Sequence, residues 1–411
     1  MIKRYIQHLF SSTPQSEKAH PAQQQNNAGG FVFTVSPWTR LERFLILGCE
    51  GGSYYASERK MTLDNAKAVQ ECLALDGLRT VATIVEISSQ GRAPKNDPAI
   101  FALAMCSAHS DPAVRKAALG AVAQVCRIGT HLFHFAESAA CFRHWGRAMR
   151  GAVAGWYNDK TPETLAVQLV KYAQRDGWSH RDLLRLSHPT APDAAHNALY
   201  RWVAGQGSQA FELATTKGRA PVIGDLPEYV NGFERLRKAT SAKEIVELIR
   251  QYHFTHEMIP TEWKNEVAVW EALLPHMPMT ALLRNLAKMT QVGLLAPMSA
   301  ASKLACSQLT DAKRLRAARV HPLSILMALK VYEQGHGEKG SLTWTAVPMI
   351  LSALNDAFYA AFQSIEPSGK NTLLALDVSG SMTWGNLAGM PGVTPRVASA
   401  AMSMVTARTE S

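Results

Sequence analysis

The sequence predicts a mainly α-helical protein in which a long series of helices is followed by the start of an α/β unit. Between about residues 36 and 362 apolar residues recur at helical spacing in short segments, many of them bounded by capping residues or glycine. No comparable β-alternation precedes residue 372. Residues 371–411 change character to strand, polar loop and helix, the opening of a βα unit in a parallel sheet.

Capping signals mark where the helices of the long series begin. An N-cap residue followed by proline, or a Ser three residues before an acid, satisfies backbone N–H groups that have no partner inside the helix. Four such pairs are Asp111–Pro112, Thr161–Pro162, Ser179–Asp182 and Ser241–Glu244. The segment after Thr161 is expected to stay helical until just before Gly177. Short capped helices with short loops favour antiparallel helix pairs stacked as an α-solenoid.

The stretch LLALDVSGSMTWG, residues 373–385, opens the C-terminal unit. Leu373 to Leu376 and Val378 are expected to form a buried strand, and a helix is expected from Arg396 to Thr406. A buried parallel strand needs neighbouring strands, which the remaining residues cannot supply. We therefore expect a chain cut inside its second domain; a cloned fragment, a frameshifted product and a natural truncation all fit.

Composition is that of a soluble protein: 411 residues, 47% hydrophobic and 18% charged. No run approaches the roughly 18 to 20 apolar residues that a membrane span needs. The N-terminal thirty residues lack the apolar core of a signal peptide, and their polar composition from Ser11 to Gly30 predicts disorder. Six scattered cysteines favour reduced thiols in a cytoplasm over a disulfide framework.

Charge points to a polyanionic partner for the N-terminal part of the chain. Lys and Arg outnumber Asp and Glu by 43 to 33, which gives a net charge of +10 and a pI near 9.3. Within residues 371–411 the charges cancel, so the excess lies upstream.

The densest basic-aromatic stretch is KYAQRDGWSHRDLLRLSH, which carries Tyr172 and Trp178. Its basic residues are Lys171, Arg175, His180, Arg181, Arg185 and His188. Lys171 and Arg175 are four residues apart and are expected on one helical face, where two cations can clamp successive phosphates. The alternative is a solvated helix face with Trp178 in the core. A second basic candidate, KRLRAARVHP, is more simply explained as solvated surface.

Asp377, Ser379 and Ser381 form the pattern D-x-S-x-S directly after the expected strand. One carboxylate with two hydroxyls suits a hard cation such as Mg²⁺, whereas the alternative is a polar strand-to-helix turn. A serine nucleophile is disfavoured because the G-x-S-x-G elbow is absent. A zinc cluster is disfavoured at HLFHFAESAACFRHW, because its ligand spacing fits no common site; packed or RNA-facing histidines are expected instead.

Several long motifs, taken in order, resemble one family. They are RFLILGCEGGSYY, VCRIGTHLFHF, WGRAMRGAVAGWYNDK, KYAQRDGWSHRDLLRLSH, MPMTALLRNLAKMT and ARVHPLSILMALKVYEQGHG. From about Phe31 to Glu410 the chain is similar to the Ro 60 kDa autoantigen family of ribonucleoproteins. The resemblance implies a TROVE module over 31–369, a ring-like α-solenoid of HEAT-like repeats. It also implies a von Willebrand factor A domain of Rossmann-like α/β fold over 370–411, incomplete here, and leaves 1–30 as a disordered segment.

The resemblance further implies a function in RNA quality control and stress survival. Small noncoding Y-like RNAs would bind on the outer surface, with family contacts at Lys171, Arg175 and His188. Single-stranded 3′ ends of misfolded RNAs would enter a basic central hole, and an exoribonuclease would be tethered through RNA. D-x-S-x-S matches the first segment of a metal-ion-dependent adhesion site whose later segments would lie beyond Ser411. We therefore expect Mg²⁺ to bind weakly.

We thus expect a non-catalytic, cytoplasmic RNA-binding protein without a membrane partner, in which His180, Arg181 and Arg185 add to the three family contacts. The rival from another class is a helical-repeat protein-interaction adaptor with a metal-dependent adhesion domain. A nuclease is disfavoured because no acidic cluster accompanies the basic stretch.

Overall fold

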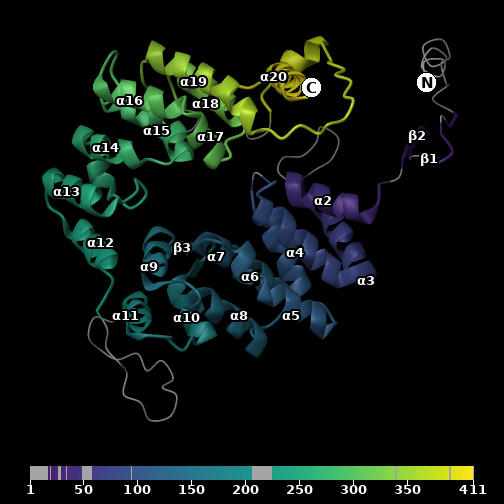
Figure 1. Cartoon of the computed structure of the whole chain (residues 1–411), viewed down its shortest axis with the longest axis horizontal. Coiled ribbons are helices and arrows are strands. Elements are labelled where there is room, and N and C mark those ends of the chain that lie inside the picture. The colour runs from purple at the N-terminus through teal and green to yellow at the C-terminus, as the bar shows by residue number, and fades with distance from the viewer. Residues whose placement is uncertain are drawn as a thin grey trace. The chain divides into compact units, whose positions relative to one another are not determined.

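A computed structural model describes residues 17–18, 20–25, 29–33, 35–48, 58–93, 95–205, 225–337, 340–387 and 390–410. These residues are mainly helical, with two short antiparallel strand pairs, which confirms the predicted mainly α class (Figure 1). The chain divides into two compact units. We call them unit 1 (residues 1–157 and 174–189) and unit 2 (residues 158–173 and 190–411).

Unit 1 packs its helices around an aromatic core. Its elements are β1 (Gln23–Gln25), β2 (Phe31–Phe33), α2 (Pro37–Leu47), α3 (Glu58–Gln90), α4 (Asp97–Ser107), α5 (Pro112–Gly120), α6 (Val122–Val125), α7 (Gly129–Phe142), α8 (Arg147–Asn158), β3 (Gln174–Arg175), β4 (Trp178–Ser179) and α10 (His180–Ser187). Helix α4 packs against both α3 and α7. Phe133 and Phe135 of α7 and Trp156 and Tyr157 of α8 are fully buried.

Unit 2 is a succession of helices in which neighbours in sequence are often neighbours in space. Its elements are α9 (Pro162–Lys171), α11 (Ala194–Val203), α12 (Glu228–Lys238), α13 (Ala242–Tyr252), η1 (Thr261–Asn265), α14 (Val267–Leu273), η2 (Leu274–His276), α15 (Met279–Gln291), α16 (Ala300–Leu309), α17 (Ala312–Ala317), α18 (Pro322–Glu333), α19 (Pro348–Ala360), η3 (Ala361–Ser364), η4 (Gly380–Thr383) and α20 (Pro395–Thr409). Helix α18 packs against α15 and α19, and α12 contacts α9 and α13 (Figure 1).

The predicted capping residues begin helices in both units. Asp111 Oδ1 accepts a hydrogen bond of 2.8 Å from the N–H of Ala113 at the start of α5. Thr161 Oγ1 accepts one of 3.3 Å from Thr164 at the start of α9, and Ser241 caps α13 in the same way. Each bond satisfies an N–H group that has no partner inside its helix. These three predicted helix starts are confirmed.

Helix α3 consists of two helices joined at a kink. Asp76 has non-helical φ and ψ of −160° and 97°, and its Oδ1 accepts a 2.9 Å bond from the N–H of Arg79, which caps the second segment. At the next position, Gly77, a Cβ atom would lie 2.5 Å from Cγ2 of Val114 in α5. The lack of a side chain at residue 77 therefore lets α3 and α5 approach closely.

The buried strand predicted over Leu373–Val378 is wrong. Residues 371–378 have no regular secondary structure, and Leu373 and Val378 are 93% and 87% exposed. A strand needs a neighbour for its N–H and C=O groups, and no described segment pairs with this one. The helix predicted from Arg396 to Thr406 is confirmed as α20.

Short strand pairs occur where β-structure was not predicted. Strand β1 lies within the segment expected to be disordered and pairs antiparallel with β2, which follows that segment, in the register Gln24 to Val32. Much of the rest of that segment lies outside the described residues. Strands of two or three residues are too short to produce an alternation that a sequence window can detect. The two short strand pairs therefore do not contradict the absence of β-alternation before residue 372.

Two further expectations concern the cysteines and the membrane. Cys72, Cys106 and Cys126 are buried, Cys306 is half-buried and Cys141 is exposed, whereas Cys49 lies outside the described residues. None of the described helices combines the length and the apolar composition that crossing a bilayer requires.

Candidate nucleic-acid interface

The basic-aromatic stretch folds as a helix end, a hairpin and a second helix. Helix α9 ends at Lys171, and Arg175 lies in β3, paired with Trp178 of β4. Asp176 and Gly177 form the two-residue turn, with φ of 53° and 78°. These left-handed conformations belong to the tight hairpin turns that Asp-Gly favours. The prediction that Lys171 and Arg175 share a helical face is wrong, because the Asp-Gly turn outweighs the helical periodicity.

The hairpin is fastened to α7 at two points. His134 Nδ1 lies 2.5 Å from Asp176 Oδ2, and Trp178 Nε1 donates a 2.7 Å hydrogen bond to Glu137 Oε2. His134 and Glu137 are three residues apart and therefore share one face of α7. Arg175, whose Nε lies 3.6 Å from Asp176 Oδ1, is exposed on this braced hairpin.

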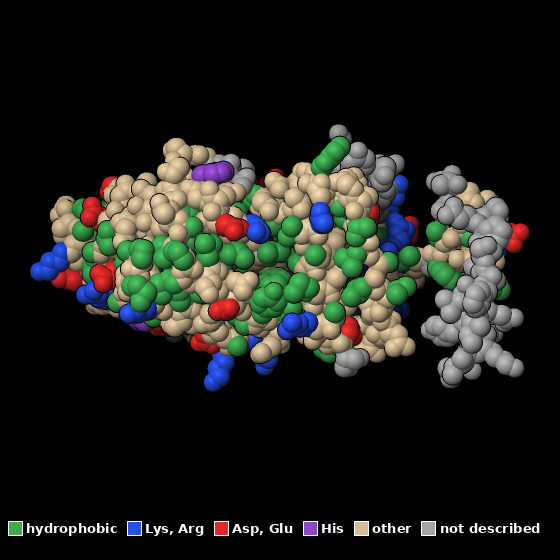
Figure 2. Space-filling view, turned by 90° about the horizontal axis from the view of Figure 1, so that it is seen from above, with side chains coloured by type: hydrophobic (Ala, Val, Ile, Leu, Met, Phe, Trp, Pro, Cys, Tyr) green, Lys and Arg blue, Asp and Glu red, His purple; other side chains and the backbone are tan. Residues whose placement is uncertain are grey.

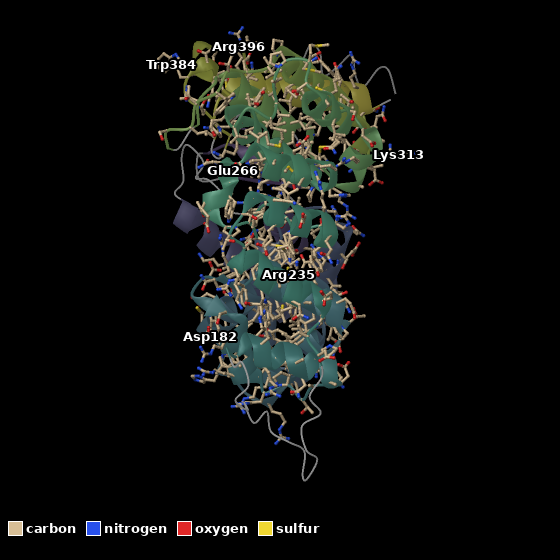
Figure 3. The ribbon with its side chains drawn as sticks, turned by 90° about the vertical axis from the view of Figure 1, so that its left-hand side faces the viewer. Asp182, Arg235, Glu266, Lys313, Trp384 and Arg396 are labelled. Atoms are coloured by element: carbon tan, nitrogen blue, oxygen red, sulfur yellow. The ribbon has the colours of Figure 1, made fainter. Side chains whose placement is uncertain are left out.

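Helix α10 begins with a complete capping box and presents two arginines. Ser179 N–H donates to Asp182 Oδ2 at 3.0 Å, and Asp182 N–H donates to Ser179 Oγ at 3.3 Å, which confirms the predicted pair (Asp182 is labelled in Figure 3). Arg181 and Arg185 are both exposed. Being four residues apart, they lie on one face of the helix.

His188 ends α10 in the left-handed conformation, with φ of 47°, and its N–H donates to the carbonyl of Leu184 at 3.0 Å. Its side chain is exposed. Unit 1 thus places four exposed basic residues on the hairpin strand β3, on α10 and directly after α10. We call Arg175, Arg181, Arg185 and His188 the β3–α10 basic segment.

The prediction that His180 contacts RNA is wrong, because this residue is buried in the aromatic core. It is 2% exposed, and its Nδ1 lies 2.8 Å from the hydroxyl of Tyr157. Its ring centroid is 4.7 Å from that of Phe133 and 6.2 Å from that of Trp156. An imidazole enclosed in this way holds α10 on the core and cannot reach a nucleic acid.

Lys171 belongs to unit 2, where it is the last residue of α9. Its Nζ lies 5.5 Å from the centroid of the Tyr172 ring, within the range of a cation–π contact. A cation in the last turn also interacts favourably with the negative end of the helix dipole. The half-buried side chain is therefore oriented by its own helix end.

The second basic candidate serves mainly to join segments of unit 2. Arg314 Nη2 donates to the carbonyl of Met277 at 2.7 Å, and Arg316 Nη2 donates to that of Gln363 at 3.3 Å. Lys313 is exposed and is labelled in Figure 3. On the face drawn in Figure 2, Lys and Arg side chains are interspersed with Asp and Glu.

The candidate metal loop is exposed and internally hydrogen-bonded. Asp377 Oδ1 accepts a 2.8 Å bond from the N–H of Ser379, and this bond lowers the pKa of the carboxyl group. The hydroxyl oxygens of Ser379 and Ser381 lie 2.9 Å apart. Trp384, 79% exposed, follows in the same loop (Figure 3). These oxygen donors fit a hard cation in kind, and a single carboxylate suits only weak binding.

No group of three or more His, Cys, Asp or Glu side chains in the described part of the chain is placed to hold a metal ion. Of the histidines weighed as zinc ligands, His134 pairs with Asp176 instead, and His131 lies beside Asn96.

The residues that position the hairpin could not be found from the sequence. Trp178 and Glu137 are 41 residues apart, and no local pattern links such distant partners. The one available signal was the Asp-Gly dipeptide at the turn, which predicts the hairpin but not what it packs against.

Comparisons with known proteins agree with one another. A family model described as the TROVE domain matches residues 24–330. RNA-binding protein RO60 of Deinococcus radiodurans is 40% identical over 399 residues, which cover 97% of this chain and 73% of that relative. RNA-binding protein RO60 of Caenorhabditis elegans is 38% identical over 435 residues, which cover 90% and 67%. The crystal structure of the Deinococcus radiodurans Ro (Rsr) protein matches with a TM-score of 0.75 at 39% identity, covering 91% of this chain and 74% of that one. The chain therefore belongs to the TROVE-domain family of Ro proteins, as its motifs indicate.

Proposed function

We propose that this protein binds RNA as a non-catalytic ribonucleoprotein scaffold. The observation that carries the proposal is the β3–α10 basic segment, in which exposed guanidinium groups project from a hairpin and a helix that are both anchored in unit 1. Exposed guanidinium groups neutralise phosphates and form paired hydrogen bonds with them. Both curated relatives are named RNA-binding proteins rather than enzymes, which supports the same assignment.

The proposed structured ligand is a small noncoding Y-like RNA on the outer surface. Lys171, Arg175 and His188 occupy the positions that the family resemblance assigns to this contact, and the last two belong to the β3–α10 basic segment. Lys171 and Arg175 would contact phosphates, while the shape of the RNA would supply selectivity, as is usual for double-stranded RNA.

A second mode follows from the family resemblance. We propose that the helical repeats form a HEAT-like ring whose basic central hole takes the single-stranded 3′ ends of misfolded RNAs, for quality control and stress survival. An exoribonuclease tethered through the bound RNA would be the partner that degrades them. The net charge of +10 favours a polyanionic ligand for this mode as well.

We also propose that residues 370–411 belong to a von Willebrand factor A domain and that Asp377, Ser379 and Ser381 bind Mg²⁺ weakly. The donor chemistry of the loop supports this. An ion there would draw the two serine hydroxyls and the carboxylate together and so order the exposed loop.

The decisive experiment compares a triple variant, Lys171→Ala/Arg175→Ala/His188→Ser, with a control, Lys243→Ala/Arg250→Ala. The control removes the same two formal charges from exposed positions on α13. Affinity for a stem-loop RNA is measured from low to high salt. Loss of two phosphate contacts should weaken binding and lower the slope of log K against log salt by about two in the triple variant alone.

The same stem with a single-stranded 3′ tail tests the second mode. The tailed RNA should bind the wild-type protein more tightly than the blunt RNA, and the triple variant should keep this preference. Equal loss in the triple variant and the control would refute the Y-like contact. Absence of RNA binding by the wild-type protein would refute the proposal and favour the protein-interaction adaptor.

A further inference from the structure

Unit 1 contains a pocket whose lining includes no residue of the β3–α10 basic segment. It lies between the end of α3, the loop that leads to α4 and the beginning of α7. Its polar lining consists of Ser88, Lys95, Asn96, Asp97, Arg127 and His131. Convergent polar groups in a pocket fix the orientation of a bound ligand.

Much of this lining is held in place before any ligand binds. Ser88 Oγ donates to Asn96 Oδ1 at 2.7 Å and accepts from Arg127 Nη1 at 2.9 Å. Asn96 Nδ2 donates to the carbonyl of Val125 at 2.8 Å, and it lies 3.5 Å from His131 Nδ1. A network of this kind fixes three elements relative to one another, so a ligand would pay little entropy to order them.

The charges of the pocket are mixed. Lys95 and Arg127 are exposed cations, and no described carboxylate lies within ion-pair distance of Arg127. Only Nη1 of Arg127 is held by Ser88, through its carbonyl at 3.0 Å and its hydroxyl, whereas a guanidinium carries five N–H donors in all. Asp97 adds one exposed carboxylate, 3.5 Å from His134 Nε2.

The helices add a weaker preference for an anion. Helices α4 and α7 both begin at the pocket, and neither has a side-chain N-cap hydrogen bond. The positive ends of two helix dipoles therefore lie beside Arg127 and Lys95.

We infer that this pocket binds one ribonucleotide unit of single-stranded RNA, with a phosphate at Arg127 and Lys95 and a ribose hydroxyl at Asp97. The inference rests on the proposed RNA-binding function and names one subsite for it. A simple anion would be repelled by Asp97, and a simple cation by Arg127 and Lys95. A ribonucleotide carries an anionic group and hydroxyl donors a few ångströms apart, which matches the mixed set. Because only RNA has the 2′-hydroxyl, Asp97 would also favour RNA over DNA.

The first test measures the affinity of the whole chain for fluorescent octauridylate by anisotropy at fixed salt. Arg127→Gln is compared with Arg43→Gln, which removes the same charge from an exposed position on α2 of the same unit. A charge-assisted contact to phosphate should make the Arg127 variant bind about tenfold more weakly than the control. Equal affinities of the two folded variants would overturn the inference.

The second test asks whether Asp97 distinguishes ribose from deoxyribose. The ratio of affinities for octauridylate and for octadeoxyuridylate is measured for the wild-type protein and for Asp97→Asn. The ratio should fall about threefold or more, because asparagine loses the charged acceptor while the phosphate contacts remain. An unchanged ratio would remove Asp97 from the site and overturn the ribonucleotide assignment.

A third measurement avoids folding effects, because it uses the wild-type protein. Burial, and then the charge of Arg127, lower the pKa of His131 to about 4, so its ring is neutral near pH 7. A phosphate beside it should shift its NMR signal, assigned with His131→Gln. Octauridylate should produce the shift, whereas inorganic phosphate should not; an equal shift with inorganic phosphate would show a simple anion site and overturn the ribonucleotide assignment.

The outcomes separate this inference from the proposed function. Stem-loop binding with no His131 shift from octauridylate overturns the pocket assignment and leaves the proposed function standing. No binding of any RNA overturns both. An acidic peptide such as hexaglutamate that competes as well as octauridylate would show a site for protein carboxylates and overturn the inference.

Discussion

The contact between His134 and Asp176, which we call the brace, should position the hairpin that carries Arg175. The two side chains are 22% and 34% exposed, and their nitrogen and oxygen lie 2.5 Å apart. A fully exposed ion pair contributes about 0.2–1 kcal/mol, and a hydrogen bond to a charged group about 1.5–3 kcal/mol. A pair that is exposed to this smaller extent lies between these ranges, so we expect a coupling free energy of about 1 kcal/mol.

A double-mutant cycle with His134→Asn and Asp176→Asn measures this coupling. Asparagine tolerates the left-handed φ of 53° at residue 176, so the turn should survive the substitution. Because the brace acts locally, the assay is hydrogen–deuterium exchange of a peptide spanning residues 172–180. Loss of about 1 kcal/mol should lower its protection about fivefold in either single variant, with little further loss in the double variant.

RNA binding provides the functional readout of the same brace. His134→Asn should weaken stem-loop RNA binding about threefold without changing the salt slope, because Arg175 is retained but less well positioned. Arg175→Ala should lower the slope by about one. Additive exchange effects in the cycle, or a lower salt slope for His134→Asn, would refute the assignment of His134 as a positioning residue.

Three further predictions concern packing, pH and metal. Gly77→Ala should destabilise unit 1 by about 1–3 kcal/mol because its Cβ would meet Val114 Cγ2 at 2.5 Å, and Val114→Ala in the same chain should recover part of the loss in urea unfolding. The pKa of His131 is lowered from 6.5 to about 4, so the unfolded chain takes up the proton first and stability should fall as the pH drops from about 6.5 towards 4, by at most about 3 kcal/mol. His131→Gln should flatten that part of the curve of unfolding free energy against pH. Calorimetry should detect Mg²⁺ binding no tighter than about millimolar, abolished by Asp377→Ala; micromolar binding would contradict a site with one carboxylate.

Local chemistry explains which parts of the fold could be predicted from the sequence. Asp111, Thr161 and Ser179 each act on an N–H group two or three residues away, so a short window contains both partners. The same holds for the helix from Pro395 to Thr409, whose Thr394 cap and Pro at the first position are contiguous. The Asp-Gly turn is equally local, but the helical periodicity around it led to the prediction of a continuous helix.

Tertiary context explains the failures. A strand over Leu373–Val378 is specified by its apolar residues only if another strand pairs with it, and none does in the described part of the chain. His180 and Arg181 are adjacent and both basic, yet one is buried against Tyr157 and the other is exposed. Which of the two residues is buried depends on which face of α10 meets the core, and this cannot be deduced from the composition of the segment.

Helix α7 connects these observations, because its faces serve different purposes. Phe133 and Phe135 are buried in the core on which His180 rests, whereas His134 and Glu137 hold the hairpin and His131 lines the pocket. None of the described side chains on α7 is a Lys or an Arg, although the helix positions the cations on its neighbours. Substitutions on α7 should therefore change RNA affinity without changing the salt slope, whereas substitutions in the β3–α10 basic segment that remove an arginine should change both.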